Sequence, residues 1–467
     1  MDGRRRLRAG LGLGAVILLV ALASGEVLAH AAGLRDSGAS AVEVPTWLFL
    51  STGGGAVGAS FLLASFVTDR AFIRSVHHWS RRLPSPGRLL SLAGRLTGLG
   101  LLGLTVYVGY AGPPTGTRNF AVVFVWVAWW GGYVASTYLV GNSWPTLNPF
   151  RTIADLLPTV GRQYPDRLGA WPSVVGLLAL IFLEVVTPLA DDPRLLSTIV
   201  LAYGAVTVTG AVIFGSDVWF SSVDPIARAF ALFGRFAPVE RTDDGIALRL
   251  PGMALTDRGV VSGRDEVAFV VCLLYVTTFD GFVGTWLWEA LAVGVVGVGV
   301  PPLAVYAVAY LAGFGLFVGA FWWSMGLARR YGTTFITREA LGRRFAPSLV
   351  AIAVGYHLAH NLGFVLSLLP TVVVVGADPL TPPQQPPVLA GLPGWFSGVE
   401  MAFVLAGHVL AVWIAHAAAY DLLPGRLAAI KSQYGITLVM VGYTMISLWI
   451  VTTPLVEPPF LAGGASP

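Results

Sequence analysis

Long uninterrupted apolar runs alternate with short polar segments along most of this chain. Each run covers about 20 residues, the length that an α-helix needs to cross the hydrocarbon core of a bilayer. Polar and apolar residues do not alternate within the runs, as they would in the strands of a transmembrane barrel. The pattern therefore predicts an all-α fold, a polytopic bundle of about ten transmembrane helices. The predicted spans are roughly 45–67, 89–111, 119–141, 171–190, 193–214, 265–283, 303–326, 346–369, 397–420 and 434–453.

The first 29 residues have the features of a secretory signal. Arginines cluster between residues 4 and 8, an apolar stretch covers 11–23, and "VLA" at 27–29 suits signal peptidase. Cleavage there would leave His30 as the new N-terminus, whereas an uncleaved segment would act as an anchor and an eleventh span. We expect residues 30–467 to form a single transmembrane helical domain.

The distribution of basic residues predicts the orientation of the spans. Alternate loops, together with the N-terminal tail, hold 25 of the 29 Lys and Arg, so these loops are expected to face the cytoplasm. With a cleaved signal and ten spans, both mature termini lie outside the plasma membrane. The net charge of +4 does not indicate a nucleic-acid partner, because the arginines lie beside spans, where lipid headgroups bind them. The only cysteine, Cys272, excludes an intrachain disulfide.

Composition agrees with a membrane protein. The chain of 467 residues is 55% hydrophobic and 12% charged, against about 25% charged in soluble proteins. Two cytoplasmic loops share a pattern in which Asn148 or Asp224 precedes a proline and an amphipathic stretch. An Asn or Asp cap followed by proline starts a helix, so we expect short interfacial helices there. The glycine-rich stretch 284–302 is predicted to be an interfacial or re-entrant segment.

Four histidines fall inside two consecutive spans. His357 and His360 lie near the middle of the eighth span, and His408 and His416 lie on the ninth. Consecutive antiparallel helices are usually neighbours, so these side chains could form a polar seam near the bilayer midplane. Intramembrane ionisable residues are costly and usually functional. The seam could bind zinc, copper or iron, bind haem less readily, relay protons, or simply make hydrogen bonds between helices.

Two carboxylates and the new N-terminus complete the candidate set. Glu184 lies within apolar residues of the fourth span, and Asp280 lies near the end of the sixth. Either can serve as a catalytic base or as a further metal ligand. His30, as an N-terminal residue, would offer an amine and a ring nitrogen to copper. It would lie outside the bilayer, as a separate site.

Several motifs in order resemble one protein family. They are "NFAVVFVWVAWWGG" at 119–132, "LNPFR" at 147–151, "LEVVTPLADDPR" at 183–194, "VTTFDGF" at 276–282, "AGHVLAVWIAH" at 406–416 and "KSQYGITLVMVGYTMISLW" at 431–449. In this order they resemble polytopic membrane proteins of actinobacteria and haloarchaea that are commonly labelled fenitrothion hydrolase. The resemblance covers nearly the whole mature chain.

The resemblance implies hydrolysis of organophosphate esters. Residues matching the family pattern are His360, His408, His416, Glu184 and Asp280, whereas His357 departs from it. The first hypothesis is therefore a membrane hydrolase of apolar esters that uses a metal-activated water. The alternatives are a copper- or haem-binding protein for metal handling or electron transfer, and a proton-coupled transporter. The expected partners are the lipid bilayer and a small apolar molecule or metal ion; the sequence gives no indication of partner subunits.

Overall fold

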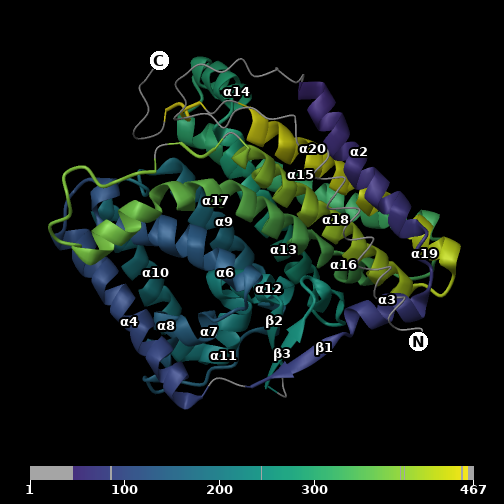
Figure 1. Cartoon of the computed structure of the whole chain (residues 1–467), viewed down its shortest axis with the longest axis horizontal. Helices are drawn as coiled ribbons and strands as arrows, with labels where there is room; N and C mark the ends of the chain where they lie inside the picture. The colour runs from purple at the N-terminus through teal and green to yellow at the C-terminus, as the bar shows by residue number, and fades with distance from the viewer. Residues whose placement is uncertain are drawn as a thin grey trace.

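The computed structural model describes residues 46–84, 87–242, 245–389, 391–393, 395–453 and 456–460. The predicted signal segment and His30 lie outside the described residues. Within them the chain is an all-helical bundle with one small sheet (Figure 1). The predicted fold class is confirmed.

Each of the ten predicted spans is helical. They correspond to α2 (Thr46–Ser65), α4 (Arg88–Ala111), α5 (Phe120–Val122) with η2 (Val123–Tyr133) and α6 (Val134–Leu139), α9 (Trp171–Val186), α10 (Pro193–Phe214), α13 (Arg264–Val283), α15 (Pro302–Tyr331), α17 (Ser348–Ala377), α18 (Phe396–Leu422) and α20 (Tyr434–Thr452). Among the described residues, eight helices are long and apolar enough to cross a membrane. A ninth counts if α2 is joined to α3 (Arg70–His77) across a bend of 118°. The remaining predicted span, α9, has 16 residues and is shorter than a full crossing.

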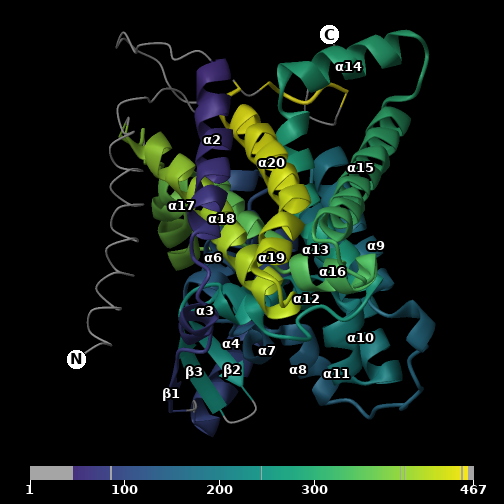
Figure 2. The ribbon, with the colours of Figure 1, turned by 90° about the vertical axis from the view of Figure 1, so that its right-hand side faces the viewer.

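Polar connections gather at one end of the molecule. Figure 1 shows the sheet, α3, α8 (Pro149–Asp155) and α11 (Ser216–Val218) together, and Figure 2 places α14 (Trp286–Gly297) at the opposite end. We call the first of these the sheet end. The loops predicted to be cytoplasmic supply its elements, as alternating spans require. Within the stretch 284–302, α14 is a helix of 12 residues that lies across the opposite end (Figure 2), and an interfacial or re-entrant placement stays a prediction.

Both predicted short helices begin as expected. The Asn148 carboxamide oxygen accepts hydrogen bonds from the backbone N–H of Phe150 and Arg151 at the start of α8. Asp224 caps α12 (Pro225–Phe236) in the same way, with 2.7 Å from the Ala227 N–H to a carboxylate oxygen. Further short helices complete the connections: η1 (Gly116–Arg118), α7 (Trp144–Leu147), η3 (Asp166–Leu168), η4 (Trp219–Val223), η5 (Met253–Thr256), α16 (Arg338–Phe345) and α19 (Arg426–Ser432).

A three-stranded antiparallel sheet is a feature that the apolar pattern did not predict. Its order is β1 (Ser80–Leu83), β3 (Gly245–Arg249), β2 (Val239–Thr242), with Ser80 opposite Arg249 and Val239 opposite Leu248. The sheet joins two connections far apart in the sequence. Its strands are short and mostly polar, so neither hydrophobic periodicity nor length identifies them.

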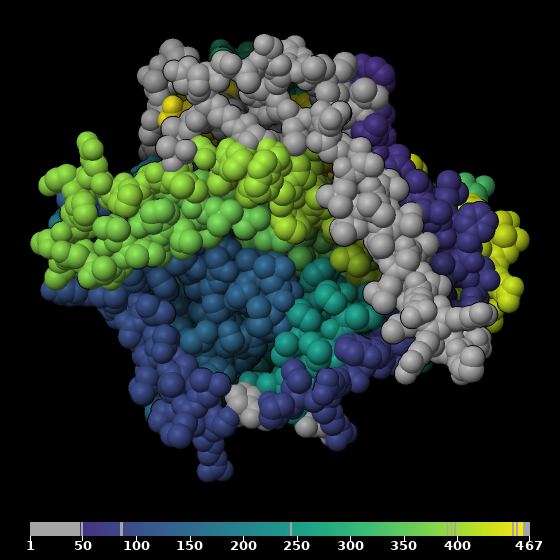
Figure 3. Space-filling view, in the orientation of Figure 1, coloured from purple at the N-terminus to yellow at the C-terminus, as the bar shows by residue number. Residues whose placement is uncertain are grey.

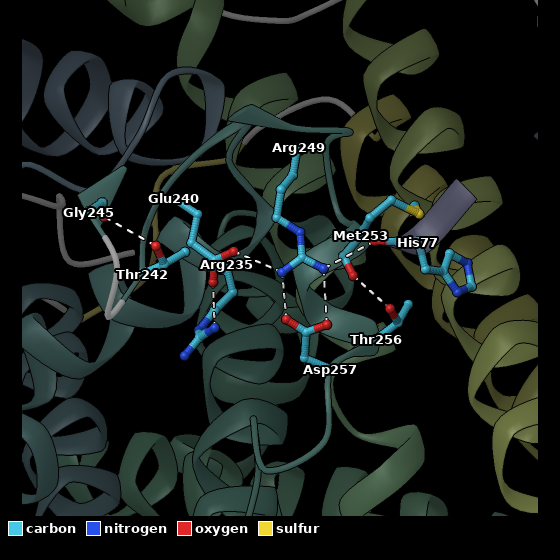
Figure 4. A network of polar contacts seen from close by, with 9 residues as sticks. All are labelled: His77, Arg235, Glu240, Thr242, Gly245, Arg249, Met253, Thr256 and Asp257. Atoms are coloured by element: carbon cyan, nitrogen blue, oxygen red, sulfur yellow. Dashed lines mark hydrogen bonds and ion pairs between the residues drawn. The ribbon is translucent and has the colours of Figure 1, made fainter. Parts of the chain in front are cut away.

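Ion pairs fix the sheet to its surroundings (Figure 4). The Arg249 guanidinium donates to Asp257 at 2.6 and 3.0 Å and to Glu240 at 2.9 Å. It also donates to the backbone carbonyl of His77 at 3.2 Å, which ties the sheet to α3. Arg235 donates to the other carboxylate oxygen of Glu240. Every carboxylate oxygen of Glu240 and Asp257 therefore has an arginine partner.

The centre of the bundle is built from α13, α17 and α18. α17 and α18 cross at Gly355 and Gly407, where a Cβ on Gly355 would lie 2.9 Å from the Gly407 Cα. Small residues allow such close approach, which is how helices gain contact energy in lipid. The prediction that the eighth and ninth spans are neighbours is confirmed. In α13, 14 of the 20 residues are buried, including every residue from 267 to 276, so this helix lies in the core.

Candidate functional site

Three helices bring two carboxylates and a histidine to one cavity. Glu184 comes from the end of α9, Asp280 from the last turn of α13 and His360 from the middle of α17. α13 packs against both other helices, so it places Asp280 between the other two side chains. The cavity has a volume of about 20 Å³, room for about one water molecule.

Local sequence explains why the carboxylates lie at helix ends. α9 ends at Val186, directly before Thr187 and Pro188, and proline disfavours a helical residue before it. α13 ends at Val283 with Gly284 as its C-cap. Glu184 and Asp280 therefore lie in final helical turns, where unbonded backbone carbonyls and a nearby carboxylate both favour a bound positive charge.

His360 and Asp280 form the closest pair in the cavity. The His360 Nε2 lies 3.7 Å from a carboxylate oxygen of Asp280, longer than a direct hydrogen bond. Their side chains are 45% and 39% exposed, so the cavity is open on one side rather than sealed. An ion pair forms here when His360 is protonated, and one bound water can bridge the two groups.

Tyr356 closes the cavity beside this pair. It lies one turn before His360 on α17, and its ring is stacked on the imidazole with centroids 6.0 Å apart. Its hydroxyl is buried and has no hydrogen-bond partner among the described residues. A Cβ on Gly281 would lie 2.8 Å from that oxygen, so glycine next to Asp280 makes room for it. The unpaired hydroxyl, beside Asp280, calls for a ligand such as water.

His357 lines the same cavity, although it departs from the family pattern. It is 2% exposed, and its Nδ1 lies 2.9 Å from the Tyr138 hydroxyl. Its Nε2 has no hydrogen-bond partner in the described part of the chain. Trp130 on η2 contacts the ring edge to face, with centroids 5.9 Å apart. The cavity thus contains two buried polar atoms, on His357 and Tyr356, whose hydrogen bonds the described protein groups do not supply.

The other predicted histidines lie elsewhere. His408 is fully buried, and its Nδ1 bonds the carbonyl of Val404 on its own helix at 2.8 Å. His416 is bonded through both ring nitrogens, to Gln433 at 3.2 Å and to the Val67 carbonyl at 2.9 Å. Neither lines the cavity. α17 and α18 do touch, but they do so at glycines, and the imidazole of His408 turns to Val404.

The donor groups do not form a metal site as they are placed. Among the described residues, no group of three histidine, cysteine or carboxylate side chains is close enough to hold an ion. Tetrahedral and octahedral sites need their ligands within about 2.0–2.6 Å of one centre. A metal at this cavity would require the three side chains to move together.

Several lining residues were not predicted as site residues. They are Trp130, Ile181, Val276, Thr277, Tyr356 and Asn361. Helical spacing could have indicated three of them, since Thr277 precedes Asp280 by one turn, Tyr356 precedes His360 and Asn361 follows His357. The π-helix η2 also marks the site, because such segments are often functional. Gly131 brings η2 against α17, where a Cβ would lie 2.4 Å from Val365.

Comparison with known proteins adds no family. No protein-family model, curated protein or solved structure matches the chain.

Proposed function

We propose that this integral membrane protein is a proton-coupled transporter, and that the cavity of Glu184, Asp280 and His360 is its proton-binding site. The observation that carries this proposal is the meeting of three titratable side chains from three helices in a cavity with unpaired buried polar atoms. Chains of Asp, Glu and His within a membrane are typical of proton relays in pumps and transporters.

The electrostatics support a site that holds one positive charge. Two carboxylates in one low-dielectric cavity repel each other when both are ionised. A proton or a cation between them removes that repulsion. Each group belongs to a different helix, so a change in protonation alters the forces between α9, α13 and α17. This is the coupling that a transport cycle needs.

The test is a pH titration of carboxyl groups by infrared difference spectroscopy on the full chain in lipid. The proposal expects protonated-carboxyl bands that disappear in Asp280→Asn or Glu184→Gln. Asp217→Asn is the matched control, because that side chain is 93% exposed and pairs with Arg151 at the sheet end. Spectra of Asp280→Asn and Glu184→Gln that are identical to wild type would overturn the proposal.

A metal-dependent hydrolase of apolar esters, as the family resemblance implies, is the second candidate. One imidazole and two carboxylates in one cavity are a donor set that transition metals accept. Elemental mass spectrometry on purified protein, beside His360→Ala, separates the candidates. Stoichiometric zinc, copper or iron that is lost in the variant supports the hydrolase and requires closure of the three side chains. A haem protein would instead be coloured.

A further inference from the structure

A second cavity lies beside the proton-binding cavity and is an order of magnitude larger. Its volume is about 240 Å³, and it is enclosed by α4, η2, α9, α10 and the short helices α7, α8 and α12. Its lining includes Leu101 and Leu102 of α4, Trp129 of η2 and Tyr203 of α10, which lie near the middle of their spans. The cavity is therefore at the depth of the bilayer hydrocarbon. We call it the apolar pocket.

The pocket opens to one side of the bundle. Figure 3 shows a hollow beside α4, in violet-blue, with blue residues of the third span on its floor; α17, in green, lies above this hollow and does not line the pocket. Trp144, Pro149 and Phe150 close it toward the sheet end. A molecule dissolved in the bilayer can enter sideways.

The lining offers a ligand almost no polar partner. Among the residues that the structure describes, its lining has no charged side chain and no histidine. Its hydroxyl groups are all used within the protein: Thr105 donates to the Leu101 carbonyl at 2.7 Å, Tyr133 bonds Ser143 at 3.0 Å, and Tyr203 donates to Asp224 at 2.5 Å. A charged or strongly polar ligand would lose its hydration without replacement. The pocket therefore selects an uncharged, apolar molecule.

One wall separates the two cavities. On η2, Trp129 lines the apolar pocket and its neighbour Trp130 lines the proton-binding cavity. On α9, Leu180 and Ile181 divide in the same way. π-Helical segments are rare and often occur at functional sites, and η2 contributes a side chain to each of the two cavities. Movement of η2 by a ligand in the pocket would move Trp130 against His357.

We propose that the apolar pocket binds an uncharged apolar molecule taken from the bilayer, and that η2 links its occupancy to protonation of the Glu184–Asp280–His360 cavity. The link rests on the proposed function, whereas the binding site does not. By linkage, the two ligands change each other's affinity by the same factor. The molecule in the pocket is then the transported solute.

The groups that decide the protonation of the cavity can be named. His360, His357 and Tyr356 face the two carboxylates from α17, and Tyr310 faces them from α15. η2 contributes only Trp130, which does not titrate, and α20 carries no charged residue. α18 adds Glu400, with a carboxylate oxygen beside Gly363, one turn after His360 on α17, and Asp224 accepts from Tyr203 of the apolar pocket. A pH effect on ligand binding belongs to the cavity where Asp280→Asn or Glu184→Gln removes it.

Photolabelling tests the pocket. The full chain in lipid vesicles is exposed to the apolar photolabel iodophenyl-trifluoromethyl-diazirine, and labelled peptides are mapped. The proposal expects saturable labelling of α4, η2 and α10 that is lost in Leu102→Trp, which fills the pocket. Leu96→Trp is the matched control, because Leu96 is on the same helix, does not line the pocket and is 59% exposed. Val125→Trp on η2 is a second filling variant, in case Leu102→Trp does not fold.

The carboxyl titration tests the link. The same photolabel, kept in the dark at a saturating concentration, should change the proton affinity of the cavity by about fivefold or more in wild type. It should leave the proton affinity of the cavity unchanged in Leu102→Trp. Labelling that never saturates, or that is the same in wild type and in Leu102→Trp, overturns the binding site. Saturable labelling with an unchanged titration overturns the link. Absence of any titrating carboxyl overturns the proposed function and the link, while saturable labelling would still establish the pocket.

Discussion

Two polar clusters in this molecule use similar residues in opposite ways. At the sheet end, Glu240 and Asp257 are paired with arginines at every carboxylate oxygen (Figure 4). In the proton-binding cavity, the described lining holds no arginine or lysine beside Glu184 and Asp280, and the closest basic group is the His360 imidazole, 3.7 Å from Asp280. The carboxylates of the first cluster are neutralised by arginines, whereas those of the second have no arginine or lysine beside them in the described lining.

The sheet-end cluster stabilises the fold, whereas the cavity can bind a further ligand. Pairing of buried charges holds two loops together and leaves no capacity for a further ligand. A cavity that holds two carboxylates beside His357 and His360, with no arginine or lysine in its lining as described, has capacity for a proton, at a cost in stability that evolution tolerates at functional sites. Removing a charge should therefore destabilise the sheet end and should disable the cavity without unfolding the protein.

The largest expected effect is on the cavity. Asp280→Asn removes the central carboxylate and keeps its shape, so the protein should fold, while proton uptake into vesicles after an external acid step should be lost. The measurement is the fluorescence of a pH-sensitive dye enclosed in proteoliposomes. Asp217→Asn should acidify the vesicles as wild type does. Unchanged uptake in Asp280→Asn would contradict the contrast between the clusters.

The next largest effect is at the sheet end. Glu240 is 5% exposed and accepts from Arg235 and Arg249. Glu240→Leu leaves two guanidinium groups short of a partner, and breaking such a buried pair costs about 3 kcal/mol of unfolding free energy. Thermal unfolding in detergent measures the loss. Arg241→Ala, an exposed position on the same strand, should leave the unfolding temperature unchanged.

A pH effect follows from His77. Burial lowers the pKa of its imidazole to about 4, with His78, Arg249 and Arg344 adding to the shift. The unfolded chain binds a proton near pH 6.5, so acid favours unfolding. This contribution is complete above pH 6.5 and falls away between 6.5 and about 4. From pH 6.5 to 5.5 the loss is about 1 kcal/mol.

His77→Leu isolates that contribution. The variant lacks the titrating ring, so its stability should fall less between pH 7 and 5.5 than that of wild type. Thermal unfolding at both pH values gives the comparison. His78→Leu is the control at the exposed neighbour. Parallel losses in wild type and His77→Leu would assign the acid sensitivity to other groups.

The sequence predicted the helices far better than the site. Hydrophobic runs of bilayer length locate spans because lipid leaves the backbone few alternatives. Glu184, Asp280, His357 and His360 were all predicted candidates, and the structure places them around one cavity. The cavity could not be assembled from sequence, because helix neighbours and rotation decide which side chains meet. His408 shows this, since its depth suits the seam but its ring bonds Val404.

The smallest expected effect compares two ion pairs at the start of α13. Arg264 pairs with Glu339 at the surface, with side chains 68% and 50% exposed. Two residues later, Glu266 pairs with Arg228 at 2.6 Å, where the side chains are 23% and 11% exposed. Solvent screens the first pair, so Arg264→Ala should change the unfolding free energy by less than about 0.5 kcal/mol.

Arg228→Met should cost clearly more than Arg264→Ala, because it removes the partner of a largely buried carboxylate together with a contact of the guanidinium over the Phe269 ring at 5.4 Å. Thermal unfolding of both variants, measured at low and high salt, checks the order. High salt should lower the small cost of Arg264→Ala and leave the cost of Arg228→Met nearly unchanged, because only the exposed pair is screened. Equal losses would mean that the stabilisation by an ion pair in this part of the molecule does not depend on its burial. The contrast with the cavity would then rest on Glu184 and Asp280 alone.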